Sequence, residues 1–384
     1  MKKNNTKTAA KAEEAKVAGK AKKALKAAKE GRCAKKAMDV VAAGIDIGDK
    51  DCQVWGRDAT GRITFERKVR TTRAGLAPVF GKLPKCRVVM EAGSQTRWIA
   101  EYISAMGHEV KVADPRRLRR IYESDSKSDV NDARELSEAA LDRWDRLPEV
   151  RLRSEESQKK LSVLKTRNTL VKARTALVNT VRAIVKQYGA KVRKCEPEAF
   201  PKRASEVVPE EAAVAVEPLL EQITLLTKSV KELDRWVEAE SERDVRIQAL
   251  RKVPGVGLIT AAAYVWTLDD PYRFKRSRSV GAYLGLRPKR DQSGETDKQL
   301  HITKAGNRYL RALLVSVAQG MMRKNAKDTA LKQFGLRLAQ RGGKRAKKIA
   351  AVAMARKLAV LLHHLWVTGE VYEAFPQAST KRAA

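Results

Sequence analysis

The sequence predicts an α/β domain, followed by a long helical hairpin and a mostly helical C-terminal domain. Short apolar runs separated by turn residues occupy positions 40 to 113, heptad-like patterns occupy 161 to 237, and helical patterns interrupted by glycine follow residue 247. A chain of 384 residues has room for two or three such domains. We expect the divisions to be 1–39 (basic flexible tail), 40–150 (α/β domain), 151–246 (helical arm), 247–370 (C-terminal domain) and 371–384 (tail).

The charge of the chain predicts a polyanionic partner. Lys+Arg 80 against Asp+Glu 45 gives a formal net charge of +35, and nucleic acid is the expected partner. A membrane surface is the alternative, but no apolar run reaches the roughly 20 residues of a spanning helix, and no secretory signal is present. The four cysteines lack C-x-x-C spacing, which argues against zinc and favours the reducing cytoplasm. We expect the lysine-rich tail to be flexible when free and to condense on phosphates, or else to form a marginal helix.

The α/β domain is expected to contain five strands. They are expected at 40–47, 51–57, 61–69, 86–91 and 109–113, with helices at 74–80, 95–106 and 128–144. Three strands in a meander, then helix, strand, helix, strand and a closing helix, is the element order of a ribonuclease-H-like (RuvC-like) mixed sheet. In that fold the first and fourth strands are neighbours.

Four acidic residues in this domain are candidate metal ligands. Asp46 and Glu91 would face one another at adjacent strand ends, and Asp129 and Asp132 would share one face of the closing helix. Together they can enclose two Mg²⁺ (or Mn²⁺) ions about 4 Å apart, which favour phosphodiester cleavage. The alternative is that each is an ordinary surface or helix-capping acid. The acids that compete for the same role are Asp49, Asp51, Asp114 and Asp125.

The helical arm is predicted by apolar residues at three- and four-residue spacing. The pattern runs from 161 to 185 and again from 219 to 237, on either side of a loop rich in Pro and Glu at 196–210. Such a pair predicts a long antiparallel hairpin, or coiled coil. We expect this arm to dimerise and to carry no chemistry.

The C-terminal domain contains candidate nucleic-acid contacts. Gly255 and Gly257 fit a helix-hairpin-helix turn, in which backbone N–H groups approach a phosphate, although the same pattern occurs in ordinary turns. Ser293 lies in a polar loop where a hydroxyl could be exposed, and from the residues alone it is an ordinary loop serine. A basic helix N-terminus suited to phosphate, or else a solvated helix face, is formed by Thr303, Lys304, Asn307, Arg308 and Arg311.

Several segments together resemble the DEDD transposases of the IS one-ten family of insertion sequences. The resemblance covers about residues 40 to 367 and keeps the order of the family's motifs. It rests on Gly44–Ile47 through Glu91–Gly93, on Lys127–Ala133, and on Pro254–Gly257 with Gly285–Pro288, Gln292–Gly294 and Thr303–Asn307.

The resemblance implies a RuvC-like domain, a coiled-coil arm and a C-terminal transposase domain. It implies that Asp46, Glu91, Asp129 and Asp132 bind Mg²⁺, and that Ser293 attacks DNA to form a covalent phosphoserine intermediate. It also implies a structured guide RNA (bridge RNA) that pairs with target and donor DNA, and a homo-oligomer that is a dimer of dimers.

We therefore expect an RNA-guided DNA recombinase acting in a bacterial or archaeal cytoplasm. One alternative is a RuvC-like, metal-dependent Holliday-junction nuclease that uses water as nucleophile. Another is an ATPase of the sugar-kinase or actin type, since the segment 44–48 resembles its first phosphate loop, but the second loop and the adenosine motif are absent. A basic protein that packages RNA or DNA is the non-catalytic alternative.

Overall fold

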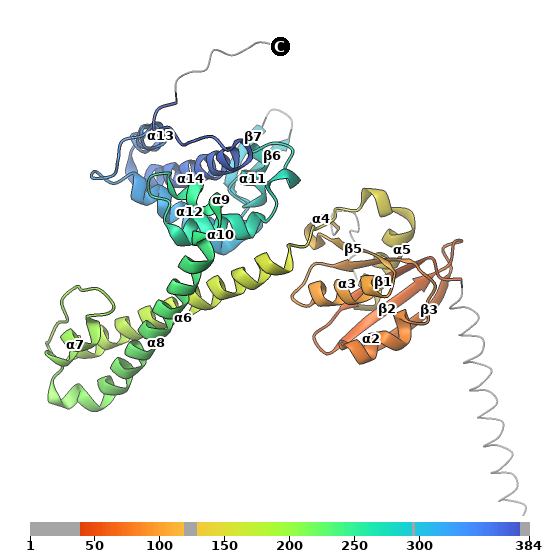
Figure 1. Cartoon of the computed structure of the whole chain (residues 1–384), viewed down its shortest axis with the longest axis horizontal. Helices are drawn as coiled ribbons and strands as arrows, with labels where there is room; N and C mark the ends of the chain where they lie inside the picture. The colour runs from red at the N-terminus through yellow and green to blue at the C-terminus, as the bar shows by residue number, and fades with distance from the viewer. Residues whose placement is uncertain (1–38, 119–128, 294–295, 377–384) are drawn as a thin grey trace, which may run out of the picture. The chain divides into compact units, whose positions relative to one another are not determined.

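A computed structural model describes residues 39–118, 129–293 and 296–376 (Figure 1). The chain divides into two compact units, Met1–Leu152 and Arg153–Ala384. The predicted flexible tail, Asp125 and residues 377–384 lie outside the described residues.

The first unit contains a mixed five-stranded sheet, as predicted. Strands β1 (Ala42–Ile47), β2 (Asp51–Arg57) and β3 (Ile63–Arg70) form an antiparallel meander. Strands β4 (Arg87–Glu91) and β5 (Glu109–Ala113) continue the sheet in parallel on the other side of β1, giving the order β3-β2-β1-β4-β5. The first and fourth strands are therefore neighbours, as the expected ribonuclease-H-like order requires.

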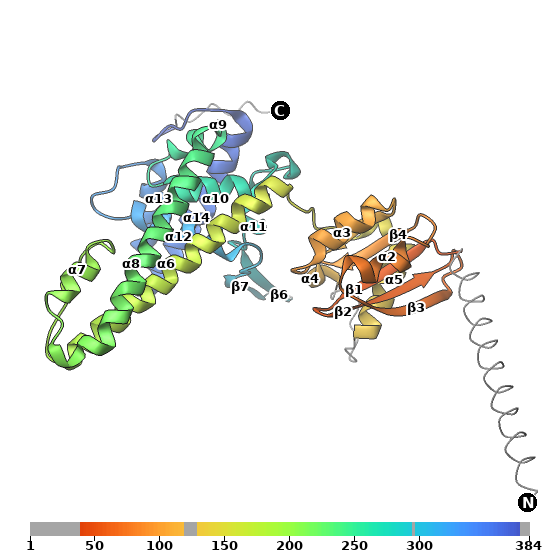
Figure 2. The ribbon, with the colours of Figure 1, turned by 60° about the horizontal axis from the view of Figure 1, so that its bottom comes forward.

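Helices cover both faces of this sheet (Figures 1 and 2). Helices α2 (Arg73–Phe80) and α3 (Thr96–Ala105) pack on one face, in a core that includes Ile45 and Met90. Helix α5 (Asp129–Asp142) packs on the other face, in a core that includes Ala42 and Val89. Alternate residues of a strand point to opposite faces, so this pairing of cores fixes which way each β1 and β4 side chain points. The short helix α4 (Pro115–Leu118) follows β5.

The second unit begins with two long helices that lie along one another. Helices α6 (Glu155–Gln187) and α8 (Glu210–Glu242) each have 33 residues, and apolar residues such as Val181, Val185 and Ile223 are buried between them. The connection, predicted as a loop, contains the short helix α7 (Phe200–Ser205). Its Phe200 is buried in the same core, an apolar anchor that periodicity over long windows does not detect.

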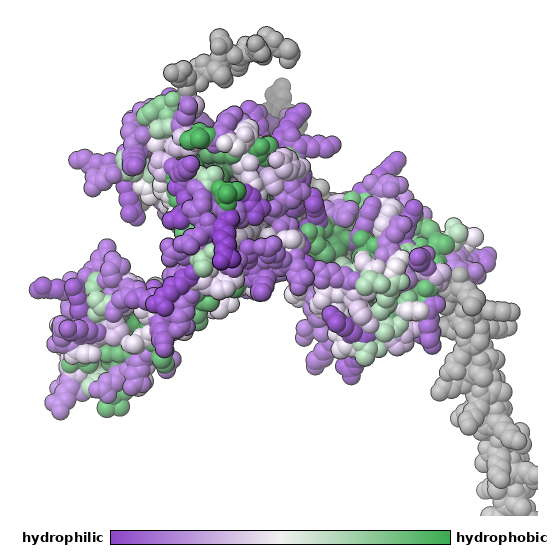
Figure 3. Space-filling model, in the orientation of Figure 1, coloured by the Kyte–Doolittle hydropathy of each residue, from purple (hydrophilic) through white to green (hydrophobic). Residues whose placement is uncertain are grey.

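Opposite charges stabilise this helix pair. Helix α6 carries eight basic and two acidic residues, whereas α8 carries nine acidic and three basic residues. Arg167 of α6 pairs with Asp234 of α8, and Lys160 Nζ lies 3.1 Å from Glu240 Oε2. Hydrophilic side chains cover most of the visible surface of both units (Figure 3).

Helix α10 (Leu258–Leu268) lies in the core of the second unit. Its Tyr264 and Trp266 are buried, and the Tyr264 hydroxyl donates to the Ala359 carbonyl at 2.6 Å. This unit also contains the helices α9 (Val245–Arg251), α11 (Arg278–Tyr283), α12 (Arg308–Met321), α13 (Ala330–Ala339) and α14 (Gly343–Thr368). Among the described helices, one stretch, Arg345–Thr368, is long and apolar enough to cross a membrane by length and composition alone, and half of it is buried within the protein.

A two-stranded ribbon replaces the polar loop expected around Ser293. Strand β6 (Pro288–Ser293) pairs antiparallel with β7 (Thr296–Ile302), and Ser293 lies opposite Thr296. The expectation of a loop at this place is wrong because these mostly polar strands have little apolar alternation. The sequence does contain one indication of a hairpin: two residues, the first of them Gly294, separate the two strands, and this is typical of a tight turn.

Candidate functional site

Strands β1 and β4 place two of the predicted metal ligands side by side. Ile45 is paired with Met90, and Asp46 and Glu91 are the next residue in each strand. Both side chains alternate with residues of the α2/α3 core, so both point to the face that α5 covers. Neighbouring strands lie about 4.8 Å apart. Both residues are half-buried.

Gly44 allows α5 to approach this part of the sheet. A Cβ atom at Gly44 would lie 2.7 Å from the carbonyl carbon of Leu136, and still closer to the backbone of Ala133 and Ser137. The backbone of α5 therefore rests directly on β1. Sequence reasoning placed Gly44 in an apolar run and in a motif, but did not detect this contact, because its partners Ala133, Leu136 and Ser137 are far away in the sequence.

The direction of α5 brings its first turn to the carboxyl end of β1. Arg57, which pairs with Ala42 at the amino end of β1, donates from Nε to Ser137 Oγ at 2.9 Å. Later residues of α5 thus lie over the amino end of β1. Measured from the middle of the contact at Gly44, Asp132 lies about 4.5 Å along the axis of α5 and Asp46 lies about 6.6 Å along β1. Both distances run toward the carboxyl end of β1.

Asp132 lies on the side of α5 that turns toward the sheet. It is half-buried, and the next residue, Ala133, is fully buried. Asp129 begins α5 one turn earlier and shares this side by helical period; its side chain lies outside what the structure describes. Burial raises the pKa of Glu135, and the negative charges of Asp132 and Glu138 raise it further. The first turns of α5 thus carry a concentration of negative charge.

The donor set fits a hard divalent cation. Asp46, Glu91 and Asp132 offer carboxylate oxygens from one end and one face of the sheet, and Mg²⁺ prefers such ligands. Among the described side chains, no three His, Cys, Asp or Glu residues are grouped closely enough to hold an ion. The side chain of Asp129 is not one of those described. Cys52 belongs to the core on the other face, and burial raises the pKa of its thiol, so it is no thiolate ligand.

The competing acids occupy other environments. Asp49 is exposed in the turn after β1 and accepts from Gln95 Nε2 at 3.5 Å. Asp51 lies 3.6 Å from basic groups of β3. Asp114 follows Ala113, the partner of Glu91, so it lies at the same end of the sheet, one strand further from Asp46.

The predicted glycine turn connects α9 to α10. Gly255 has φ +81°, a conformation that favours glycine, and a Cβ there would lie 3.0 Å from Met321. Gly257 is the N-cap of α10, where no side chain caps the helix, and a Cβ there would meet nothing within 4 Å. The backbone at the start of α10 is therefore open to approach.

Close backbone contacts fix the base of the ribbon. Gly285 (φ +68°) and Gly306 (φ +74°) let the segments on either side of the ribbon touch, since a Cβ at Gly285 would lie 2.7 Å from the Lys304 carbonyl carbon. Arg311 Nη1 donates to the carbonyls of Leu284 and Ala305, each at 2.9 Å. The sequence predicts a phosphate contact for Arg311; its observed hydrogen bonds hold this junction together.

The other predicted contacts in this segment differ in exposure. Asn307 caps α12, accepting from the Leu310 N–H at 3.0 Å, and the Thr303 hydroxyl is buried without a hydrogen-bond partner among the described residues. Lys304 and Arg308 are exposed. Of the five residues predicted here, these two basic side chains are best placed to meet a phosphate.

The chain is similar to known transposases along most of its length. Residues 43–190 match a DEDD family model described as "Transposase", and residues 247–333 match the model described as "Transposase IS116/IS110/IS902 family". The chain is 31% identical over 344 residues to a Pseudomonas aeruginosa protein named "Probable family 20 transposase", covering 85% of this chain and 96% of that one. It is 30% identical over 352 residues to the transposase for insertion sequence element IS1111A of Coxiella burnetii, covering 88% and 93%. The transposase for IS1328 of Yersinia enterocolitica is 29% identical over 292 residues, covering 74% and 85%.

Proposed function

This chain belongs to the IS116/IS110/IS902 family of transposases, and we propose that its carboxylate site and Ser293 together cut and rejoin the DNA of an insertion sequence. The observation that carries the proposal is the placement of Asp46, Glu91 and the first turn of α5 at one end and on one face of the sheet. Residues 40–150 would be the catalytic domain, 151–246 the arm and 247–370 the C-terminal transposase domain.

The four carboxylates would hold Mg²⁺ or Mn²⁺. When bound, such an ion stabilises negative charge on the phosphoryl group and on the oxygens that attack and leave. Asp46 and Glu91 are fixed by the sheet, and Asp129 and Asp132 by the start of α5. The positive end of the α5 dipole lies beside these acids and offsets part of their mutual repulsion.

Ser293 would be the nucleophile. Its hydroxyl oxygen would form a bond to the scissile phosphorus while the bond from phosphorus to the sugar oxygen breaks, and the serine proton would pass to the departing sugar oxygen. The reverse step, by a sugar hydroxyl of the joined strand, would release Ser293 and conserve the phosphodiester bond without ATP. Support comes from its place at the end of β6, on a ribbon whose base is fixed by Arg311.

Nucleic acid would be bound by several further features. The turn at Gly255 and Gly257 would contact a phosphate in the manner of a helix-hairpin-helix, and Lys304 and Arg308 would contact another. The net charge of +35 suits donor DNA, target DNA and a structured guide (bridge) RNA. The α6–α8 arm would act as a coiled coil that assembles a dimer of dimers.

Trapping of covalent protein–DNA adducts tests the chemistry. Ser293→Ala should abolish an adduct that resists denaturation and leave DNA binding intact, whereas Ser162→Ala, an exposed serine on α6, should change neither. Asp46→Asn and Asp132→Asn should abolish strand cleavage altogether. An adduct retained in Ser293→Ala would refute the serine assignment. Cleaved ends with 5′ phosphates and no adduct in the unmodified protein would support the water-using junction nuclease instead.

The guide is tested by co-purification. RNA recovered with the protein and sequenced should be one structured non-coding species with segments complementary to the DNA that is cut. A random mixture of cellular RNA would contradict guidance.

A further inference from the structure

Two cations lie on the same face of the sheet as the carboxylates, in register with them. Asp46 is paired with Gln53 of β2, and Gln53 is paired with Lys68 of β3. Residues directly opposite in a sheet point to the same face, so all three side chains project on the side of α5. Two strand spacings place Lys68 about 10 Å from Asp46.

Arg70 extends this cationic row toward the end of the sheet. It is paired with Asp51 and shares the face of Lys68, since the two are separated by one residue of the strand. Lys68 Nζ and Arg70 Nε each lie 3.6 Å from a different oxygen of Asp51. Asp51 thus orients both cations, and these three groups together keep one positive charge. The side chains of Lys68 and Arg70 are 64% and 73% exposed, so they are accessible to a partner.

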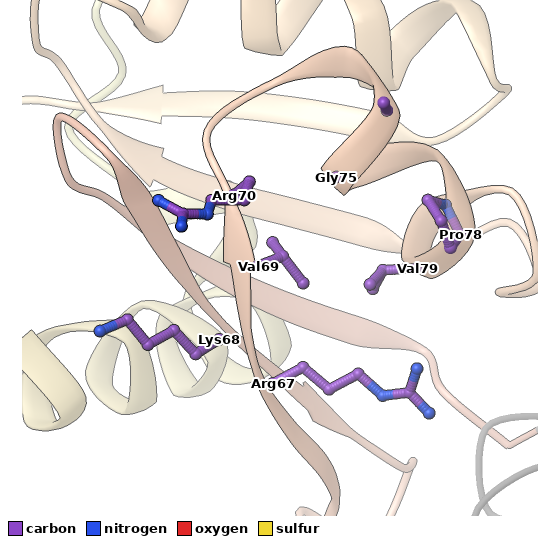
Figure 4. A pocket seen from close by; sticks show the side chains of 8 residues that line it. Arg67, Lys68, Val69, Arg70, Gly75, Pro78 and Val79 are labelled. Carbon is purple, nitrogen blue, oxygen red and sulfur yellow. The ribbon is translucent and has the colours of Figure 1, made fainter.

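The opposite face of β3 provides a contrast. A hollow between β3 and α2 is lined by residues 67–70 of β3 and by Ala74, Gly75, Pro78 and Val79. Figure 4 shows Arg67 pointing to one side of the strand, and Lys68 and Arg70 pointing to the other. Arg67 is also basic and exposed, but it faces away from the carboxylate row.

We propose that Lys68 and Arg70 bind the backbone phosphates of the DNA strand that is cut. This inference rests on the proposed role of the carboxylates. Successive nucleotides of a DNA strand advance 3.4 Å along the duplex axis and also wind around it, so a separation of about 10 Å places the cations at most about three nucleotides from the scissile phosphate. An incoming phosphate replaces Asp51 as the partner of the cations, which costs little because exposed ion pairs are weak. Gln53 lies between the two groups and presents no charge that would repel the strand.

Salt-dependent binding tests this proposal. The probe is a mixed-sequence DNA duplex, and the affinity of the full chain is measured without divalent metal. Each phosphate contact contributes about 0.9 to the slope of log affinity against log salt concentration. Raising salt from 50 to 200 mM should therefore weaken the unmodified protein about tenfold more than the Lys68→Gln/Arg70→Gln variant. The matched control is Arg62→Gln/Arg67→Gln. It removes two exposed charges, one just before β3 and one within it, that do not belong to the carboxylate row. The decrease in slope for this control should be at most half of the decrease for Lys68→Gln/Arg70→Gln.

The outcomes separate this proposal from the catalytic one. No change of slope in Lys68→Gln/Arg70→Gln overturns it, and an equal change in the control pair also overturns it by showing a diffuse charge effect. A change seen with a duplex RNA but not with DNA assigns the cations to another partner and likewise refutes the DNA contact. Asp46→Asn should retain the slope and lose cleavage. Cleavage that survives Asp46→Asn would instead overturn the carboxylate site, whatever the slope shows.

Discussion

Replacing Gly44 with alanine should displace α5 from the sheet. The added Cβ would lie 2.7 Å from the Leu136 carbonyl carbon, and a normal contact there is at least 3.4 Å. The helix must therefore move by about 0.7 Å or more, since nearer backbone atoms of Ala133 and Ser137 add to the overlap. The Leu136 atom is backbone and cannot rotate away.

This displacement should impair both stability and cleavage. Overpacking of a tight core costs about 1–3 kcal/mol, which lowers the Tm of a unit of this size by roughly 3–10 °C. Asp129 and Asp132 move with α5 while Asp46 and Glu91 stay with the sheet. A misplacement near 1 Å can reduce a rate about 100-fold.

The assays are thermal unfolding and strand cleavage, each compared with Gly320→Ala. Gly320 lies inside α12, and a Cβ there meets nothing within 4 Å, so the same substitution should stabilise the protein by about 0.5–1 kcal/mol. If Gly44→Ala unfolded at the unchanged temperature and cleaved DNA at the unchanged rate, the direct contact of α5 with β1 would be wrong.

Three further outcomes follow from other contacts. Burial opposes ionisation of Asp244, but its hydrogen bonds and ion pair with Arg246 outweigh burial and lower its pKa below the ordinary value of 3.8. The contribution of Asp244 to stability should be constant above about pH 4 and should be lost as the pH falls through the lowered pKa. Measurements of Tm against pH should show a weaker pH dependence for Asp244→Ala. This variant also loses about 1 kcal/mol of helix capping. Burial raises the pKa of the Cys86 thiol to about 12, so iodoacetamide at pH 8 should modify half-buried Cys195 well before Cys86, as peptide mass spectrometry would reveal. Asp269 accepts three hydrogen bonds from the start of α6, and Asp269→Ala should lower stability by roughly 2–3 kcal/mol, with equal Tm values contradicting that role.

The α/β domain could be predicted largely from local patterns. The strand from 42 to 47 is apolar apart from Asp46, and the turn at Asp58 has a local cause, because its carboxylate accepts from the N–H groups of Thr60 and Arg62. Both signals lie within a few residues of the element they define. The helix pair of the second unit was equally accessible, because its apolar spacing repeats over many turns.

Features that depend on distant partners could not be predicted in the same way. The role of Gly44 depends on a helix that begins at Asp129, and the structural role of Arg311 depends on carbonyls 6 and 27 residues away. The cationic row at Lys68 requires the register of two strand pairs, which hydrophobic alternation alone does not specify. The roles of the carboxylates and of Ser293 remain predictions from the sequence and from the family.

The division of the chain at Leu152 sets an order of events during synthesis. The ribbon begins at Pro288, so the ribosome must add more than 130 residues after the first unit has been made. At about 5–20 residues per second this interval lasts roughly 7–27 s, longer than most small domains need to fold. A nascent chain would therefore display a finished sheet, able to engage nearby DNA, well before the hydroxyl group proposed to break it exists.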